Sequence, residues 1–336
     1  MTPARRTLAR RLAFPALWVV AGGAVGFALR DRLPEGRDGG PLIEVRNRTH
    51  QLISPLLECD SARDSARNRA LSPFKERVEA QLRDLRRAGA ERVAVYFREL
   101  NDGLWFSVNE ELSFSPASMR KVPMLIAVLK QAERTPDLLS REIVANLQQD
   151  HDARQNFKPS AALEPGRKYP VGELLTRMIV HSDNNAFMLV SAIVDRQELA
   201  DVYDLLSMRP PTPPREEAAF SVLTYASFFR ILFNGTYLSK ELSAAALEQL
   251  ARAEFRSGIV AGVPESVLVA HKFGERSDEA TGEKQLHDCG IVYYPQRPYL
   301  LCVMTKGRRF EDLAAAIASI SRRVFDEVDA QRRAAE

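Results

Sequence analysis

The stretch FSPASMRKVPMLIAVL, residues 114–129, places a serine and a lysine three residues apart in front of an apolar run. Such a run is typical of a buried helix, so we expect Ser118 where this helix begins and Lys121 on the same face. The first N–H groups of a helix lack partners within it, which leaves the Ser118 N–H exposed to a ligand. A buried lysine of lowered pKa can act as a base toward such a serine. The alternative is a capping serine with a solvated lysine.

Two further polar motifs follow along the chain. Ser-Asp-Asn at 182–184 separates two amphipathic runs, and it either points small polar side chains into a cleft or caps the following helix. Lys-Phe-Gly at 272–274 ends a strand pattern that begins at Ser266, with Lys272 and Gly274 on one face; a solvated edge lysine is the alternative. Only nine of the 47 basic residues are lysines. Because lysine can lose its proton and arginine cannot, lysine at both motif positions favours a chemical role.

The hydrophobic pattern around these motifs changes its period along the chain. A helix is predicted to open at Ser72-Pro73, a long helical block to extend to about Ala253, and a last helix to run from Glu311 to about Val328. Strands are predicted at 92–97, 104–108, 267–273, 288–294 and 299–305. This order predicts an α+β fold, in which N- and C-terminal helices flank an antiparallel five-stranded sheet and an all-helical lobe is inserted at about 118–253.

The cysteines and histidines give no signal for a metal site. Cys289 and Cys302 would face each other across a hairpin that turns near 295–296. The favoured interpretation of this pair is two small buried hydrophobic residues, and a disulfide is the alternative. The His-Asp pairs at 151–152 and 287–288 are interpreted as surface or strand polar pairs. Neither residue type has metal-ligand spacing, so we expect no metal and no cofactor.

The N-terminal segment differs from the rest of the chain. Residues 1–32 hold six arginines against one acidic residue, and Leu12–Leu29 carries no charge. As a helix this run spans roughly 27 Å, close to a bilayer core. We expect 1–30 to be an uncleaved signal anchor, with a cleaved signal peptide or a buried core helix as alternatives.

Residues 31–70 are expected to form a linker with an apolar patch at Leu52–Leu57 that docks on the domain, and 71–335 the catalytic domain. The domain would then be extracytoplasmic, in the periplasm or cell envelope, and tethered to the membrane. Because the net positive charge belongs to the N-terminal segment, nucleic acid is not expected as a partner.

Together the motifs S-x-x-K, S-D-N and K-F-G, in this order over roughly residues 72–330, resemble the class A β-lactamases and penicillin-binding proteins. The resemblance implies a β-lactamase/transpeptidase-like fold with an active site between sheet and helical lobe. It implies that Ser118 is the nucleophile and Lys121 the general base. It further implies that Ser182 relays a proton to the leaving nitrogen and that Lys272 supplies positive charge.

The resemblance also implies how a substrate is bound. Asn184 would hold the substrate amide, and the N–H groups of Ser118 and Glu275 would form the oxyanion hole. Gly274 would let the substrate approach the backbone. Phe273 departs from the family pattern, since it lacks the hydroxyl that binds a β-lactam carboxylate.

The last expectation concerns deacylation and function. No E-x-x-x-N sequence follows S-D-N, so Glu216 and Glu217 are the candidate deacylation bases. We expect a serine hydrolase of the class A β-lactamase type, acylated at Ser118 by a β-lactam or a related cyclic or peptide amide and deacylated by water. The alternatives are a D-alanyl-D-alanine peptidase of the penicillin-binding type that acts on peptidoglycan, and a non-catalytic wall-binding scaffold.

Overall fold

The computed structural model describes residues 52–53, 69–206 and 219–335. All of them fall within one compact unit, residues 47–336. The expected anchor at Leu12–Leu29 and most of the linker lie outside the described residues, as do Glu216 and Glu217. Among the described helices none is long and apolar enough to cross a membrane.

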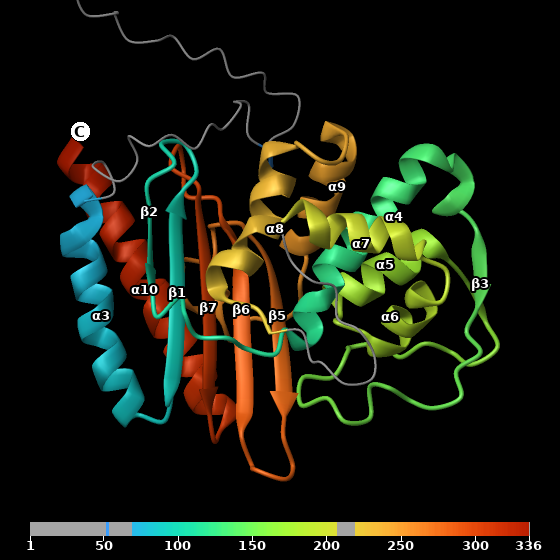
Figure 1. The fold of residues 1–336 in the computed structure, drawn as a ribbon, viewed down its shortest axis with the longest axis horizontal. Coiled ribbons are helices and arrows are strands. Elements are labelled where there is room, and N and C mark those ends of the chain that lie inside the picture. Colours follow the sequence, from blue (N-terminus) through green and yellow to red (C-terminus); the bar gives the residue numbers. More distant parts are fainter. Residues whose placement is uncertain (1–51, 54–68, 207–218, 336) are drawn as a thin grey trace, which may run out of the picture. The chain divides into compact units, whose positions relative to one another are not determined.

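A five-stranded antiparallel sheet forms the centre of this unit (Figure 1). The strand order is β2-β1-β7-β6-β5, which leaves β5 at one edge. The strands are β1 (Arg92–Glu99), β2 (Trp105–Val108), β5 (Val269–Ser277), β6 (Lys284–Val292) and β7 (Tyr299–Gly307). The five predicted strands are therefore present, although β5 ends several residues later than predicted and β6 begins several residues earlier.

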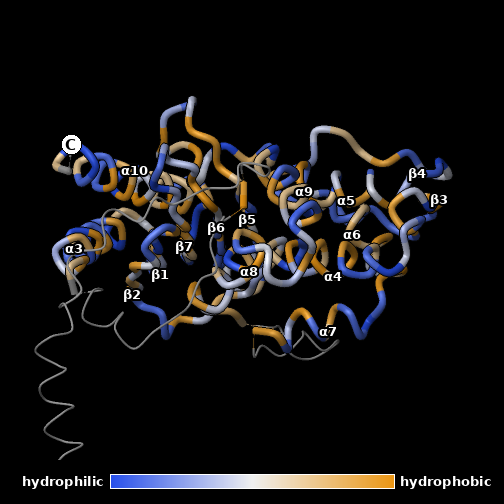
Figure 2. Tube along the Cα trace, turned by 90° about the horizontal axis from the view of Figure 1, so that it is seen from above, coloured by the Kyte–Doolittle hydropathy of each residue, from blue (hydrophilic) through white to orange (hydrophobic). Residues whose placement is uncertain are grey.

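Side-chain alternation divides the core into two layers. Val93, Val95 and Phe97 of β1 pack with α3 (Ser72–Arg87) and α10 (Phe310–Ala335) on one face of the sheet. Ala94 and Tyr96 point to the opposite face, which packs on the helical lobe. Both covering helices are amphipathic, and Figure 2 shows hydrophilic and hydrophobic residues alternating along them. Strand β1 is consequently buried on both faces rather than alternating between core and solvent.

The inserted lobe lies between β2 and β5 in the chain. Its α-helices are α4 (Lys121–Arg134), α5 (Val171–Val180), α6 (Asn184–Ser191), α7 (Arg196–Leu205), α8 (Val222–Asn234) and α9 (Lys240–Ala251). Four short 3₁₀ helices occur in the described part of the chain: η1 (Arg69–Leu71) before α3, and η2 (Ala117–Arg120), η3 (Pro136–Leu138) and η4 (Ile259–Gly262) between β2 and β5.

The prediction of an all-helical lobe needs one correction. Strands β3 (Glu142–Val144) and β4 (Lys168–Pro170) form a two-stranded sheet within the lobe, and the segment 145–167 between them contains no helix. Pro159, Pro165 and Gly166 fall in that segment, and proline and glycine disfavour a helix interior. The predicted fold class is otherwise confirmed.

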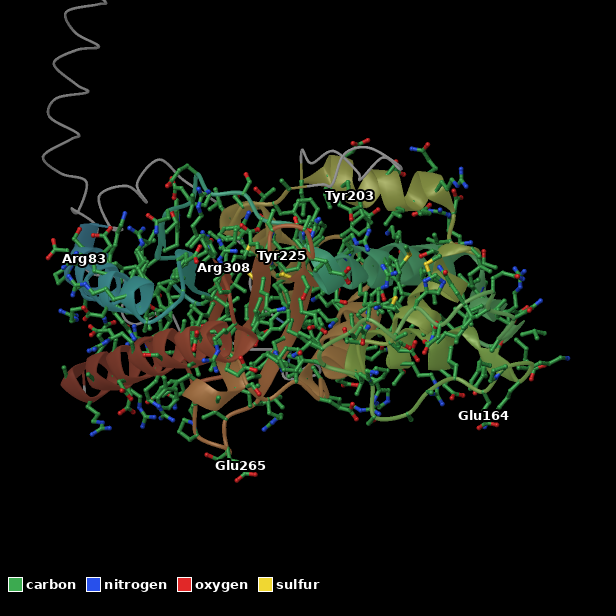
Figure 3. All side chains as sticks on the ribbon, turned by 90° about the horizontal axis from the view of Figure 1, so that it is seen from below. Arg83, Glu164, Tyr203, Tyr225, Glu265 and Arg308 are labelled. Atoms are coloured by element: carbon green, nitrogen blue, oxygen red, sulfur yellow. A yellow bond between two sulfur atoms is a disulfide. The ribbon has the colours of Figure 1, made fainter. Side chains whose placement is uncertain are left out.

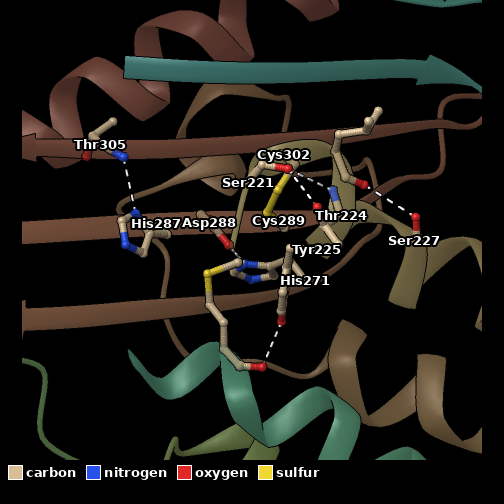
Figure 4. Close-up of a disulfide and its surroundings, with 12 residues drawn as sticks. Ser221, Thr224, Tyr225, Ser227, His271, His287, Asp288, Cys289, Cys302 and Thr305 are labelled. Atoms are coloured by element: carbon tan, nitrogen blue, oxygen red, sulfur yellow. Dashed lines mark hydrogen bonds and ion pairs between the residues drawn. A yellow bond between two sulfur atoms is a disulfide. The ribbon is translucent and has the colours of Figure 1, made fainter. Parts of the chain in front are cut away.

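The β6–β7 hairpin has the register expected from the sequence. Cys289 pairs with Cys302 across the two strands, and a disulfide joins them (Figure 4). The favoured interpretation as two unlinked cysteines is therefore wrong, because antiparallel pairing brings the two Cα atoms to 4.0 Å. Two residues of the apolar patch expected to dock on the domain lie within the described part of the chain. The Leu52 carbonyl accepts a hydrogen bond from the Tyr293 hydroxyl at 2.8 Å, and the Ile53 side chain is buried.

Candidate active site

Ser118 lies in the short turn η2 that directly precedes α4. The prediction that Ser118 begins a long helix is thus corrected by one turn: α4 starts at Lys121. The preceding Ala117 has a φ of 49°, a left-handed conformation that non-glycine residues seldom adopt and that surrounding contacts must maintain. One such contact comes from α8, where the buried Tyr225, which is labelled in Figures 3 and 4, donates its hydroxyl hydrogen to the Met119 carbonyl at 2.9 Å.

The other side of this turn packs against the edge strand β5. A Cβ atom on Gly274 would come within 2.7 Å of the Pro116 carbonyl oxygen and 2.8 Å of Met119 Cγ. Glycine at 274 therefore permits the turn that carries Ser118 to approach the strand. This packing role accounts for the glycine without any contact to a substrate.

Lys121 is the side chain that links the motifs. It is almost fully buried, and its Nζ donates to Ser118 Oγ at 3.1 Å and to Asn184 Oδ1 at 2.7 Å. The same nitrogen contacts the carbonyl of Ser182 at 2.5 Å. Burial lowers the pKa of Lys121 well below its ordinary value, and the charge of Lys272 lowers it further. A buried amine with a lowered pKa is able to accept a proton from the adjacent hydroxyl.

Ser182 lies between two lysines. Lys272 of β5 is fully buried and donates to Ser182 Oγ at 2.8 Å, while Lys121 Nζ is 3.3 Å from the same oxygen. Burial lowers the pKa of Lys272 to about 7, although Asp288 opposes the shift. The Ser182 backbone has a φ of 56°, and its carbonyl accepts hydrogen bonds from Lys121 and from Gln155 Nε2 (3.0 Å). The two lysines can thus exchange a proton through one hydroxyl.

Asn184 is held by the segment around residue 151. Its backbone N–H donates to Asp152 Oδ1 at 2.7 Å, and its Nδ2 donates to the His151 carbonyl at 3.2 Å. Asp152 is buried and also accepts from Asn185 Nδ2 at 2.7 Å. Asp183 caps α6, and burial raises its pKa to about 6 with a further contribution from Asp152. Asp152 and Asn185 were not among the predicted site residues, and the first was interpreted as part of a surface or strand pair.

A cavity of about 470 Å³ opens beside these residues. It is lined by Ser118 and Asn184, by residues of the 151–155 segment and by residues 275–279. Glu275 reaches it from β5, and its carboxylate accepts the N–H groups of residues 156 and 157, both at 2.9 Å. Burial raises the pKa of Glu275. The two N–H groups expected to form an oxyanion hole therefore belong to residues that line one cavity.

Phe273 does not line this cavity. Its ring stacks on Phe255 with centroids 4.2 Å apart and meets Phe157 edge-on at 5.7 Å. Phe273 belongs to the opposite core layer from the residues that surround Lys121. The Lys272 ammonium lies over the Phe273 ring, 4.2 Å from its centroid, so the ring covers one side of this buried lysine.

The structure therefore joins Ser118, Lys121, Ser182, Asn184 and Lys272 in one hydrogen-bonded network beside the cavity. Within the part of the chain that the structure describes, no group of three or more His, Cys, Asp or Glu side chains could hold a metal ion.

Solved structures of known proteins have a similar fold. A β-lactamase from Sphaerobacter thermophilus has 24% identity and a TM-score of 0.63, over 74% of this chain and 96% of that chain. A class A β-lactamase from Mycobacterium abscessus has 20% identity and a TM-score of 0.63, over 75% and 99%. A mutant of PBP-A, in an acyl-enzyme complex with penicillin G, has 20% identity and a TM-score of 0.61, over 75% and 97%.

At these identities the likeness to solved structures shows the fold, and no curated protein gives a match. The model of a beta-lactamase enzyme family matches residues 76–328. Because this match covers more than half of the chain, the protein belongs to the beta-lactamase enzyme family.

Proposed function

We propose that this protein is a serine hydrolase in which Ser118 is acylated by a β-lactam or a related cyclic or peptide amide. The observation that carries the proposal is the contact of 3.1 Å between Lys121 Nζ and Ser118 Oγ, made by a buried lysine of lowered pKa. A lysine held next to a serine in this way has no evident structural use, whereas a nucleophile needs such a base.

In the acylation step, Lys121 takes the proton of Ser118 as Oγ attacks the substrate carbonyl carbon. The negative charge that develops on the carbonyl oxygen would be stabilised by the N–H groups of Ser118 and Glu275. The C–N bond then breaks, and Ser182 gives its proton to the leaving nitrogen. Lys121 and Lys272 both contact the Ser182 hydroxyl and would replace that proton.

Deacylation requires water and a base. We propose Glu216 or Glu217 for this role, because they are the acidic residues in roughly the expected region of the chain after the S-D-N motif. Asn184 would orient the substrate amide at the cavity wall. A small molecule or a cell-wall peptide is the proposed substrate, and tethering through residues 1–30 on the outer side of the cytoplasmic membrane is the proposed location.

The test is the intact mass of the purified full chain after incubation with penicillin G or with a peptide ending in D-Ala-D-Ala. We expect an adduct of the acyl group that is lost in Ser118→Ala. A short-lived adduct with accumulating product would indicate a lactamase, and a long-lived one a penicillin-binding protein. Absence of adduct and product with both substrates would contradict the proposal and favour a non-catalytic scaffold.

A further inference from the structure

A pair of side chains on β6 holds the backbone three residues before Ser118. His287 Nε2 lies 3.0 Å from the Ser115 carbonyl oxygen, and the Ser115 N–H donates to Gln285 Oε1 at 3.1 Å. His287 is fully buried, and Gln285 is nearly so. Both polar groups of the Ser115 backbone are therefore bound by the sheet rather than by water.

The hydrogen bonds assign the protonation state of His287. Its Nδ1 accepts the N–H of Thr305 on β7 at 3.1 Å (Figure 4). A nitrogen that accepts an N–H carries no proton, so the single ring proton is on Nε2 and is donated to the Ser115 carbonyl. Burial lowers the pKa of His287 to about 3, which agrees with a neutral ring. His287 thus connects β7 to the turn that carries the nucleophile through two directed hydrogen bonds.

These contacts fall where the turn most needs support. Ala117 is in the left-handed region, and the turn is held on its other side by the Tyr225 bond to Met119. Ser118 therefore sits between one attachment to the sheet, at Ser115, and one to the helical lobe. Losing the attachment at 115 would let Ala117 relax and would turn Ser118 Oγ away from Lys121.

We propose that His287, supported by Gln285, is a positioning residue that sets the orientation of the Ser118 nucleophile through the Ser115 backbone. The inference rests on the proposed function insofar as Ser118 is the group that reacts. His287 touches no reacting atom in this assignment. It acts only on the geometry of the turn.

The experiment compares His287→Leu, which removes both hydrogen bonds, with His287→Gln, whose amide can accept from Thr305 and donate to Ser115. Two probes of the full chain are used, penicillin G and a fluorophosphonate that labels activated serines. The rate of Ser118 labelling is followed by intact mass over a range of probe concentrations, which separates binding from the covalent step. We expect His287→Leu to slow the covalent step roughly 10- to 100-fold with unchanged probe binding, and His287→Gln to remain within about threefold of the parent.

Ser321→Ala is the matched control. The buried Ser321 donates to the Ile259 carbonyl at 2.7 Å, so this variant loses a similar buried hydrogen bond in the other core layer. It should unfold more easily but label at the parental rate. If His287→Leu does not fold, Gln285→Leu, which loses the acceptor for the Ser115 N–H, should slow the covalent step in the same way.

Three results would overturn the inference: a folded His287→Leu that labels at the parental rate, a His287→Gln as slow as His287→Leu, or an equal loss in Ser321→Ala. If His287→Leu is unfolded, a folded Gln285→Leu that labels at the parental rate would overturn it equally. If the fluorophosphonate labels the parent protein and penicillin G does not, the proposed lactam chemistry is refuted. The fluorophosphonate rates of the variants then still measure the role of His287. Labelling by neither probe would refute both.

Discussion

Replacing Gly274 by alanine should move the nucleophile without touching it. The added Cβ would lie 2.7 Å from the Pro116 carbonyl oxygen, against about 3.4 Å for an ordinary contact, so the turn must retreat by about 0.7 Å. Pro116 and Met119 flank Ser118, which must move with them. A displacement of about 1 Å at a reacting group costs about 100-fold in rate, so we expect acylation to slow roughly 10- to 100-fold. Overpacking should also lower the free energy of unfolding by about 1–3 kcal/mol.

The assay follows acylation of Ser118 by intact mass and unfolding by urea. Gly172→Ala is the control, because its Cβ would lie 3.4 Å from the Leu139 carbonyl oxygen, an ordinary contact, near the start of α5. Alanine is preferred over glycine in a helix, so this control should gain up to about 1 kcal/mol and acylate normally. A Gly274→Ala protein with parental stability and parental acylation would refute the packing argument.

Three further predictions concern buried side chains. Burial gives Lys272 a folded pKa of about 7, below its ordinary value of 10.5. Between these two pH values the unfolded chain binds more protons than the folded protein, so the stability of the protein rises with pH in that window. Lys272→Met should therefore be more stable than the parent at pH 6, by on the order of 1–4 kcal/mol, and the difference in free energy of unfolding measured by denaturation should narrow toward pH 10. Reduction of Cys289–Cys302 should lower stability by about 3 kcal/mol, and thiol titration of the unreduced, unfolded chain should find one of three cysteines reactive; three reactive thiols would contradict the disulfide. Tyr225→Phe removes the hydroxyl that donates to the buried Met119 carbonyl and should cost about 0.5–1.5 kcal/mol in urea unfolding.

Local patterns in the sequence predicted much of the fold. Alternation and turn residues located the strands, and the symmetry of the β6–β7 hairpin about its turn was enough to place Cys289 opposite Cys302. Alternation along β5 also set Phe273 in the other core layer, and its ring packs there while the Lys272 Nζ reaches to 4.2 Å from the ring centroid.

Contacts between distant segments carried no such local signal. Asp152 binds the backbone of Asn184, and Glu275 binds the N–H groups of residues 156 and 157, across 32 and about 119 positions in the chain. Both depend on the path of the segment 145–167, where hydrophobic periodicity is lacking. A carboxylate at a strand end or in a loop looks solvated until a segment from elsewhere buries it. The three motifs could therefore be found in the sequence, whereas the residues that hold them in place could not.

The two lysines explain why sheet and helical lobe must keep a fixed relation. Lys121 begins α4 of the lobe and Lys272 lies on β5 of the sheet, yet both contact the Ser182 hydroxyl, at 3.3 and 2.8 Å. Two buried ammonium groups that contact the same hydroxyl would repel each other, so a neutral Lys121 beside Lys272 is favoured before acylation, and the proton for the leaving nitrogen then comes from Ser118. The proton that Lys121 takes from Ser118 can reach the leaving nitrogen through the Ser182 hydroxyl, and this path requires that neither layer shift. Attachment of the Ser118 turn to β6 through Ser115 and to α8 through Met119 supplies that constraint.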